Sequence, residues 1–128
     1  MEEGLKPSGV YLLLAKWPHL LRSRLYTAFL AALGGISFAI VENFMYLAVY
    51  YPDHSGALVL YRFTVGLALH AVASFIVGFG INQRLVASVR GEVPFLSGNW
   101  KFFIAGITLH ALYNMAATVA ELTGFLKF

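Results

Sequence analysis

Residues 26–51 read YTAFLAALGGISFAIVENFMYLAVYY, and this apolar run decides the fold of the chain. A helix of this length can cross the hydrocarbon core of a bilayer with some tilt. The run nevertheless contains a carboxylate and a carboxamide side by side, Glu42 and Asn43. An ionisable side chain within a membrane span usually marks a functional site. We therefore expect Glu42 to face other polar groups inside a helical bundle.

Two later apolar runs, residues 58–82 and 102–125, repeat this anomaly. His70 lies near the middle of the second run, and the third run contains His110 and Asn114. Each of these residues belongs to a stripe of small or polar residues four apart, which in an α-helix share one face. The stripes are Arg62, Gly66, His70, Ser74 and Gly78 in the second run and Gly106, His110, Asn114 and Thr118 in the third. These faces are expected to pack against one another rather than against lipid.

Composition supports a membrane protein. The chain has 128 residues, of which 59% are hydrophobic and only 12% charged. Its mean hydropathy is +0.73. So small a core cannot bury this much apolar surface, so lipid must cover the rest. We predict an all-α integral membrane bundle, a single domain over residues 1–128, with three spans near 26–51, 58–82 and 102–125.

Composition also excludes several functions. The chain has no cysteine, which excludes disulfides and thiolate chemistry. Basic residues do not cluster with aromatic ones, as they would in a protein that binds nucleic acid. The polar start of the chain, with two acids and no small-residue cleavage site, is not that of a signal peptide.

Residues 1–25 precede the first span. The apolar part of this segment, Val10–Leu21, is short and is interrupted by Lys16, Trp17 and His19. Such a segment is too short to cross a bilayer and is typical of an interfacial helix. A re-entrant helix buried in the bundle is the alternative.

The distribution of basic residues predicts the orientation. Four precede the first span and three lie between the second and third spans, whereas the loop between the first two spans has none. The positive-inside rule then places the N-terminus in the cytoplasm and the C-terminus outside.

The polar groups in the spans suit more than one function. Glu42, His70, His110 and Asn114 can all lie in the central third of the bilayer. A carboxylate or imidazole can take a proton from water, and an imidazolium or amide can stabilise an oxyanion, which suits hydrolysis. Glu42, His70 and His110 could instead bind a divalent metal. The histidines and asparagines could also serve packing alone, or the groups could conduct protons or ions.

Four motifs in order resemble those of the PrsW-type intramembrane proteases, relatives of the CAAX prenyl endopeptidase and of bacteriocin-processing membrane proteases. The resemblance covers residues 2–114. The matching motifs are Glu2-Glu3-x-x-Lys6, Phe38-x-x-x-Glu42-Asn43, Arg62-x7-His70-x7-Gly78 and His110-x-x-x-Asn114.

The resemblance implies an endopeptidase that cuts a membrane-embedded or membrane-anchored protein substrate. It implies a catalytic set of Glu2, Glu3, Glu42, His70, His110 and Asn114, to which we add Asn43, Arg62 and Lys6 as supporting residues. Glu42, His70 and His110 are described in this family either as ligands of a metal, such as zinc, or as acid, base and oxyanion groups. For Glu2 and Glu3 to reach the site, their helix must dip into the bundle; otherwise a partner or self-association as a homo-oligomer must complete it. The alternatives are an inactive relative that serves as a membrane binding or assembly module, and a proton- or ion-conducting bundle.

Overall fold

A computed structural model describes residues 2–124, and this part of the chain is helical and contains no strand. The N-terminal segment comprises α1 (Glu2–Leu5), α2 (Ser8–Lys16) and a 3-10 turn, η1 (Pro18–Leu20). The remaining helices are α3 (Arg24–Met45), α4 (Gly56–Tyr61), α5 (Leu67–Gly78), α6 (Gln83–Val89) and α7 (Trp100–Leu122). Two π-helical turns, η2 (Tyr46–Tyr50) and η3 (Arg62–Gly66), extend α3 and join α4 to α5.

Three continuous helices are long and apolar enough to cross a membrane, Arg24–Tyr50, Gly56–Gly78 and Trp100–Leu122. The prediction of three spans is therefore confirmed. All three spans begin two residues earlier than expected, and the second ends at Gly78 because residues 79–82 turn back toward α6. The predicted end of the third span, residue 125, lies outside the described residues.

Serine caps begin the first two spans. Ser23 Oγ accepts a hydrogen bond from the backbone N–H of Tyr26 at 3.1 Å, and Ser55 Oγ accepts one from Leu58 at 3.2 Å. Each cap satisfies one of the backbone donors that a helix leaves unpaired at its first turn. The sequence thus marks the first residues of α3 and α4 locally.

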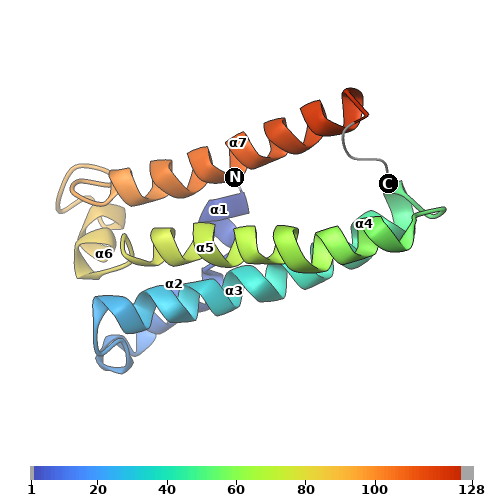
Figure 1. Cartoon of the computed structure of the whole chain (residues 1–128). Helices are drawn as coiled ribbons and strands as arrows, with labels where there is room; N and C mark the ends of the chain where they lie inside the picture. The colour runs from blue at the N-terminus through green and yellow to red at the C-terminus, as the bar shows by residue number, and fades with distance from the viewer. Residues whose placement is uncertain (1, 125–128) are drawn as a thin grey trace.

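α5 is the central helix, with α3 on one side and α7 on the other (Figure 1). The contacts run along the predicted small-residue faces. A Cβ atom at Gly78 would lie 2.5 Å from Cα of Ala28 on α3, and one at Gly106 of α7 would lie 2.6 Å from Cγ2 of Val77. Glycine is thus required for these helices to approach so closely. The second-run stripe faces α3 at Gly78, whereas the third-run stripe packs against α5 at Gly106 and His110 and is exposed at Asn114 and Thr118. The prediction that the two stripes pack against one another therefore holds only for the half of α7 that includes His110.

α1 lies inside the bundle, between α5 and α7, at about half their length (Figure 1). Glu3 and Lys6 are 3% and 5% exposed, and Pro7 is fully buried. α1 also touches α3, because a Cβ atom at Gly34 would lie 2.6 Å from the backbone oxygen of Lys6. Of the two alternatives for the N-terminal segment, its first helix adopts the one that dips into the bundle.

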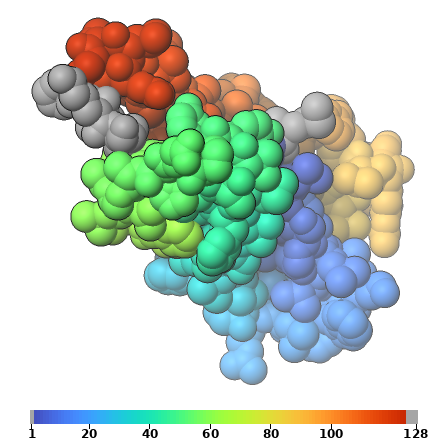
Figure 2. Space-filling view, turned by 90° about the vertical axis from the view of Figure 1, so that its right-hand side faces the viewer, coloured from blue at the N-terminus to red at the C-terminus, as the bar shows by residue number. Residues whose placement is uncertain are grey.

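α2 packs on the flank of the bundle. It buries Val10 and Leu14 against Ala31, Ile81 and Leu85, and it ends before Pro18, which cannot donate a backbone hydrogen bond. Viewed from the α4 end, the blue N-terminal segment covers one flank of the bundle, and the last turns of α7 lie at the opposite corner (Figure 2).

Candidate active site

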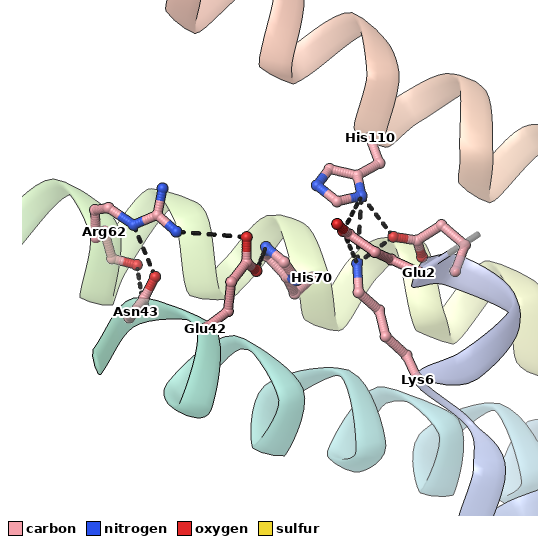
Figure 3. Close-up of polar contacts among 8 residues, drawn as sticks. Glu2, Lys6, Glu42, Asn43, Arg62, His70 and His110 are labelled. Atoms are coloured by element: carbon pink, nitrogen blue, oxygen red, sulfur yellow. Dashed lines mark hydrogen bonds and ion pairs between the residues drawn. The ribbon is translucent and has the colours of Figure 1, made fainter. Parts of the chain in front are cut away.

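The first polar pair of the site joins α3 to α5. Glu42 Oε2 lies 3.2 Å from His70 Nε2, so a carboxylate and an imidazole predicted to converge do so. Glu42 Oε1 lies 3.6 Å from the guanidinium of Arg62 (Figure 3). The Arg62 guanidinium also stacks over the ring of Tyr46, with 3.8 Å between Cζ and the ring centroid.

Asn43 holds Arg62 in place. Its side-chain N–H donates to the backbone oxygen of Arg62, and Arg62 Nε donates to Asn43 Oδ1, both at 2.9 Å. Asn43 is 1% exposed, so these bonds satisfy an amide that would otherwise be buried unpaired. The π-helical turns η2 and η3 lie beside this pair, and π-helical turns often occur at functional sites. Asn43 therefore supports the site through Arg62.

The second polar pair joins α1 to α7. Glu3 Oε1 lies 2.7 Å from His110 Nδ1. The Lys6 ammonium contacts the same Glu3 oxygen and lies 3.3 Å from His110 Nδ1. Glu2 is more distant, with its Oε2 3.8 Å from His110 Nδ1 and 3.9 Å from Lys6 Nζ (Figure 3).

The two pairs meet through their histidines. The rings of His70 and His110 have centroids 4.9 Å apart and are inclined at 62°. Phe38 stacks near His70 at 6.2 Å, and the Lys6 ammonium lies 5.3 Å from the centroid of the Phe38 ring. Residues from α1, α3, α5 and α7 thus form one cluster about half-way along the bundle.

Burial distinguishes the two N-terminal acids. The Glu3 side chain is 4% exposed, whereas that of Glu2 is 51% exposed. Burial by itself would raise the pKa of Glu3, but hydrogen bonds from His110 and Lys6, together with their charges, outweigh it and lower the pKa below the ordinary value. Glu3 is therefore a buried carboxylate held in its ionised form.

Three buried polar atoms of the cluster have no hydrogen-bond partner among the described residues: Glu3 Oε2, Glu42 Oε2 and His70 Nδ1. Glu42 Oε2 is included because its 3.2 Å contact with His70 Nε2 does not have the geometry of a hydrogen bond. Nearly all buried polar groups in proteins are paired with protein or water. In this packing of residues 2–124, the three atoms nevertheless remain unpaired.

Asn114 lies at the edge of the cluster and is exposed. It borders two cavities. One, of about 270 Å³, is also lined by Glu2, Glu3 and His110. The other, of about 300 Å³, is lined by Glu42 and Arg62 and extends to Glu121 near the end of α7. The structure thus places Asn114 between the two carboxylate–histidine pairs.

The donors present are of the right chemical type for a divalent metal, since two imidazoles and a carboxylate are a known zinc set. Their arrangement does not fit one. Within residues 2–124, no group of three or more histidine or acidic side chains is placed to hold a metal ion, and this includes the predicted set of Glu42, His70 and His110. The ammonium of Lys6 also lies against His110 Nδ1, where its charge opposes a second cation.

Fold and site together define an integral membrane protein with a carboxylate–histidine cluster enclosed by its spans. A family model described as PrsW family intramembrane metalloprotease matches residues 1–127. The chain therefore belongs to the PrsW family. Comparisons with curated proteins and with solved structures found no match.

Two features of the site were not predicted from the sequence. Phe38 was expected only as the first position of a motif, yet its ring lies beside both His70 and Lys6. Glu121 lines the cavity that reaches Glu42. The sequence feature that could have identified Glu121 is an acid within an apolar run, three residues after Thr118 of the third-span stripe.

Proposed function

We propose that this protein is an intramembrane endopeptidase that hydrolyses a peptide bond of a membrane-embedded or membrane-anchored protein. Family membership supports a protease. The single observation that carries the proposal is the contact of the buried carboxylate Glu3 with His110, 2.7 Å apart, at mid-depth in the bundle. The contact fixes the position of the Glu3 carboxylate, and a general base must be positioned and ionised in order to accept a proton.

In the proposed reaction, Glu3 is the general base. Its Oε1 is engaged by His110 and Lys6, so its buried and unpaired Oε2 is the atom that accepts a proton from water. The water oxygen bonds to the carbonyl carbon of the scissile peptide, and the carbonyl electron pair moves onto its oxygen. When the tetrahedral intermediate collapses, the C–N bond breaks and Glu3 returns the proton to the leaving amine.

The other residues of the cluster stabilise the oxyanion or orient the histidine rings. The Asn114 amide, which borders both cavities, is the proposed donor to the oxyanion, a contribution of the kind that preorganised donors make in other hydrolases. Glu42 and Arg62 fix the His70 ring, and His70 in turn packs against His110. No step of this scheme passes through a metal, because the donor arrangement does not fit one.

The two adjacent acids provide a matched test. Glu3→Gln removes the base while it keeps the shape of the side chain, and we expect cleavage of a membrane-tethered reporter to fall by about 10²–10⁴-fold. Glu2→Gln makes the same change at a half-exposed position and is expected to have a far smaller effect. Equal loss in both variants, or a larger loss in Glu2→Gln, would show that Glu3 is not the base.

A proton conductor is the second candidate, because polar groups follow one another along the bundle. Glu121, Arg62 and Glu42 line one cavity, and His70 and His110 continue the series toward Glu2. Liposomes that contain the protein distinguish this function. A proton flux that disappears in Glu42→Gln, without reporter cleavage in the wild type, would favour conduction over proteolysis.

A further inference from the structure

An apolar groove lies outside the polar cluster, at the end of the bundle where α6 is found. Its volume is about 560 Å³. It is formed by α2, α6, the loop of residues 90–99 and the first turns of α7. The apolar side chains that line it include Leu14, Ala15, Val86, Val89, Phe95 and Phe103. The proposed protease reaction uses none of these residues.

The loop that closes the groove is fixed by specific hydrogen bonds. Ser88 Oγ, on α6, accepts from the backbone N–H of Leu96 at 2.7 Å and donates to the backbone oxygen of Pro94 at 3.2 Å. Arg84 donates to Ser97 Oγ at 3.0 Å. These bonds hold the loop with Phe95 and Leu96 at the wall of the groove, so the groove is a formed feature of the fold.

The position of the groove corresponds to the headgroup region of a bilayer. α3 and α7 begin at this end of the bundle and α5 ends there (Figure 1). Trp17 and Trp100 are half exposed near these helix ends, at 47% and 55%, as aromatic residues at a membrane interface are. An apolar cavity at this depth opens where lipid chains and phosphate groups are both present.

The charge at this end is strongly positive. Arg90 lines the groove itself. The other exposed basic residues nearby are Lys16, Arg22, Arg24, Arg84 and Lys101. Among the described residues the single acid here is Glu92, which is exposed and 4.0 Å from Arg90, a separation at which an exposed ion pair contributes little. The groove is therefore apolar inside and cationic at its rim.

We propose that this groove binds one acyl chain of an anionic phospholipid, whose phosphate contacts Arg90. An apolar segment of a protein partner would match the interior but would leave the basic rim without a counterpart, whereas an anionic lipid satisfies both. The lipid packs against α2, and only Pro7 separates the buried Lys6 of the polar cluster from α2. The bound lipid thereby holds in place the segment that carries Glu3.

The test measures lipid retention and needs no proteolytic activity. The purified full chain is incubated in detergent with equal amounts of phosphatidylglycerol and phosphatidylcholine of identical acyl chains, and bound lipid is counted by native mass spectrometry. We expect the wild type to retain one phosphatidylglycerol with a preference of about fivefold, the effect of one basic residue near an anionic membrane surface. Arg90→Ala should retain lipid without preference, and Arg24→Ala, at the same end but outside the groove, should behave as the wild type.

Two further variants address the groove interior. Ala15→Trp fills the groove and should abolish retention, while Leu12→Trp, on an exposed position of the same helix, should not. If Ala15→Trp fails to fold, Val89→Asp, at a position 74% exposed, places a negative charge at the groove and should also abolish retention. Equal retention of the two lipids by the wild type, unchanged retention in the groove variants, or a dimer that the groove variants disrupt would overturn the proposal.

Discussion

The position of α1 depends on a single glycine of α3. A Cβ atom at Gly34 would lie 2.6 Å from the backbone oxygen of Lys6, against an ordinary contact distance of at least 3.4 Å. The obstructing atoms belong to backbone and cannot rotate away. Gly34→Ala must therefore push α1 outward by about 0.8 Å, which displaces Glu3 from His110.

The expected effect on catalysis is large. A misplacement of about 1 Å in a catalytic constellation can reduce the rate by about 10²-fold. We expect a loss of this size in reporter cleavage by purified protein in liposomes. Overpacking should also destabilise the protein by about 1–3 kcal/mol, which leaves it folded for the assay.

Two other glycines give matched controls. A Cβ atom added to Gly4 in α1 or to Gly9 in α2 would have no neighbour within 4 Å, so alanine fits at both positions. Gly4→Ala and Gly9→Ala should cleave the reporter at the wild-type rate. A Gly34→Ala protein that is folded and equally active would refute the reasoning that close α1–α3 packing positions Glu3.

The same geometry makes three more predictions. Lys6→Met removes a hydrogen bond and a positive charge, both of which offset the effect of burial on the pKa of Glu3. The pKa of Glu3 should therefore rise, and the acidic limb of the pH–rate profile should move to higher pH. An unmoved acidic limb would mean that Lys6 does not act on the base. Treatment with a chelator should leave cleavage unchanged, because the described donors form no metal-binding group, and loss of activity restored by zinc would contradict this. In a chain without cysteine, Ser55→Cys should react with an impermeant thiol reagent from outside the cell and Glu92→Cys only from the cytoplasmic side. The reverse pattern would contradict the orientation predicted from the distribution of basic residues.

Local sequence determined much of the fold. The three spans followed from run length and hydropathy, since a bilayer imposes a minimum helix length. The packing faces followed from the four-residue spacing of glycine, serine and histidine, which places these residues on one side of a helix. The approach of Glu42 to His70 was foreseeable for the same reason, because both lie at similar depth on such faces.

The N-terminal segment could not be predicted in the same way. α1 is one helical turn, too short for a periodic signal, and its place between α5 and α7 depends on contacts far away in sequence, such as Lys6 with His110. The choice between a metal and a lysine ammonium at the site also depends on distances between helices, which residue spacing within one helix does not contain. The π-helical turns beside Arg62 likewise have no marker such as proline.

The central claim is that the histidines of α5 and α7 and the buried Glu3 form a peptide-hydrolysing site. Cleavage of a membrane-tethered reporter by purified His70→Ala and His110→Ala variants tests it most directly. Loss of either ring should break the cluster that positions Glu3, and we expect cleavage to fall by at least about 10²-fold in each variant. Cleavage by either variant at the wild-type rate would contradict the claim.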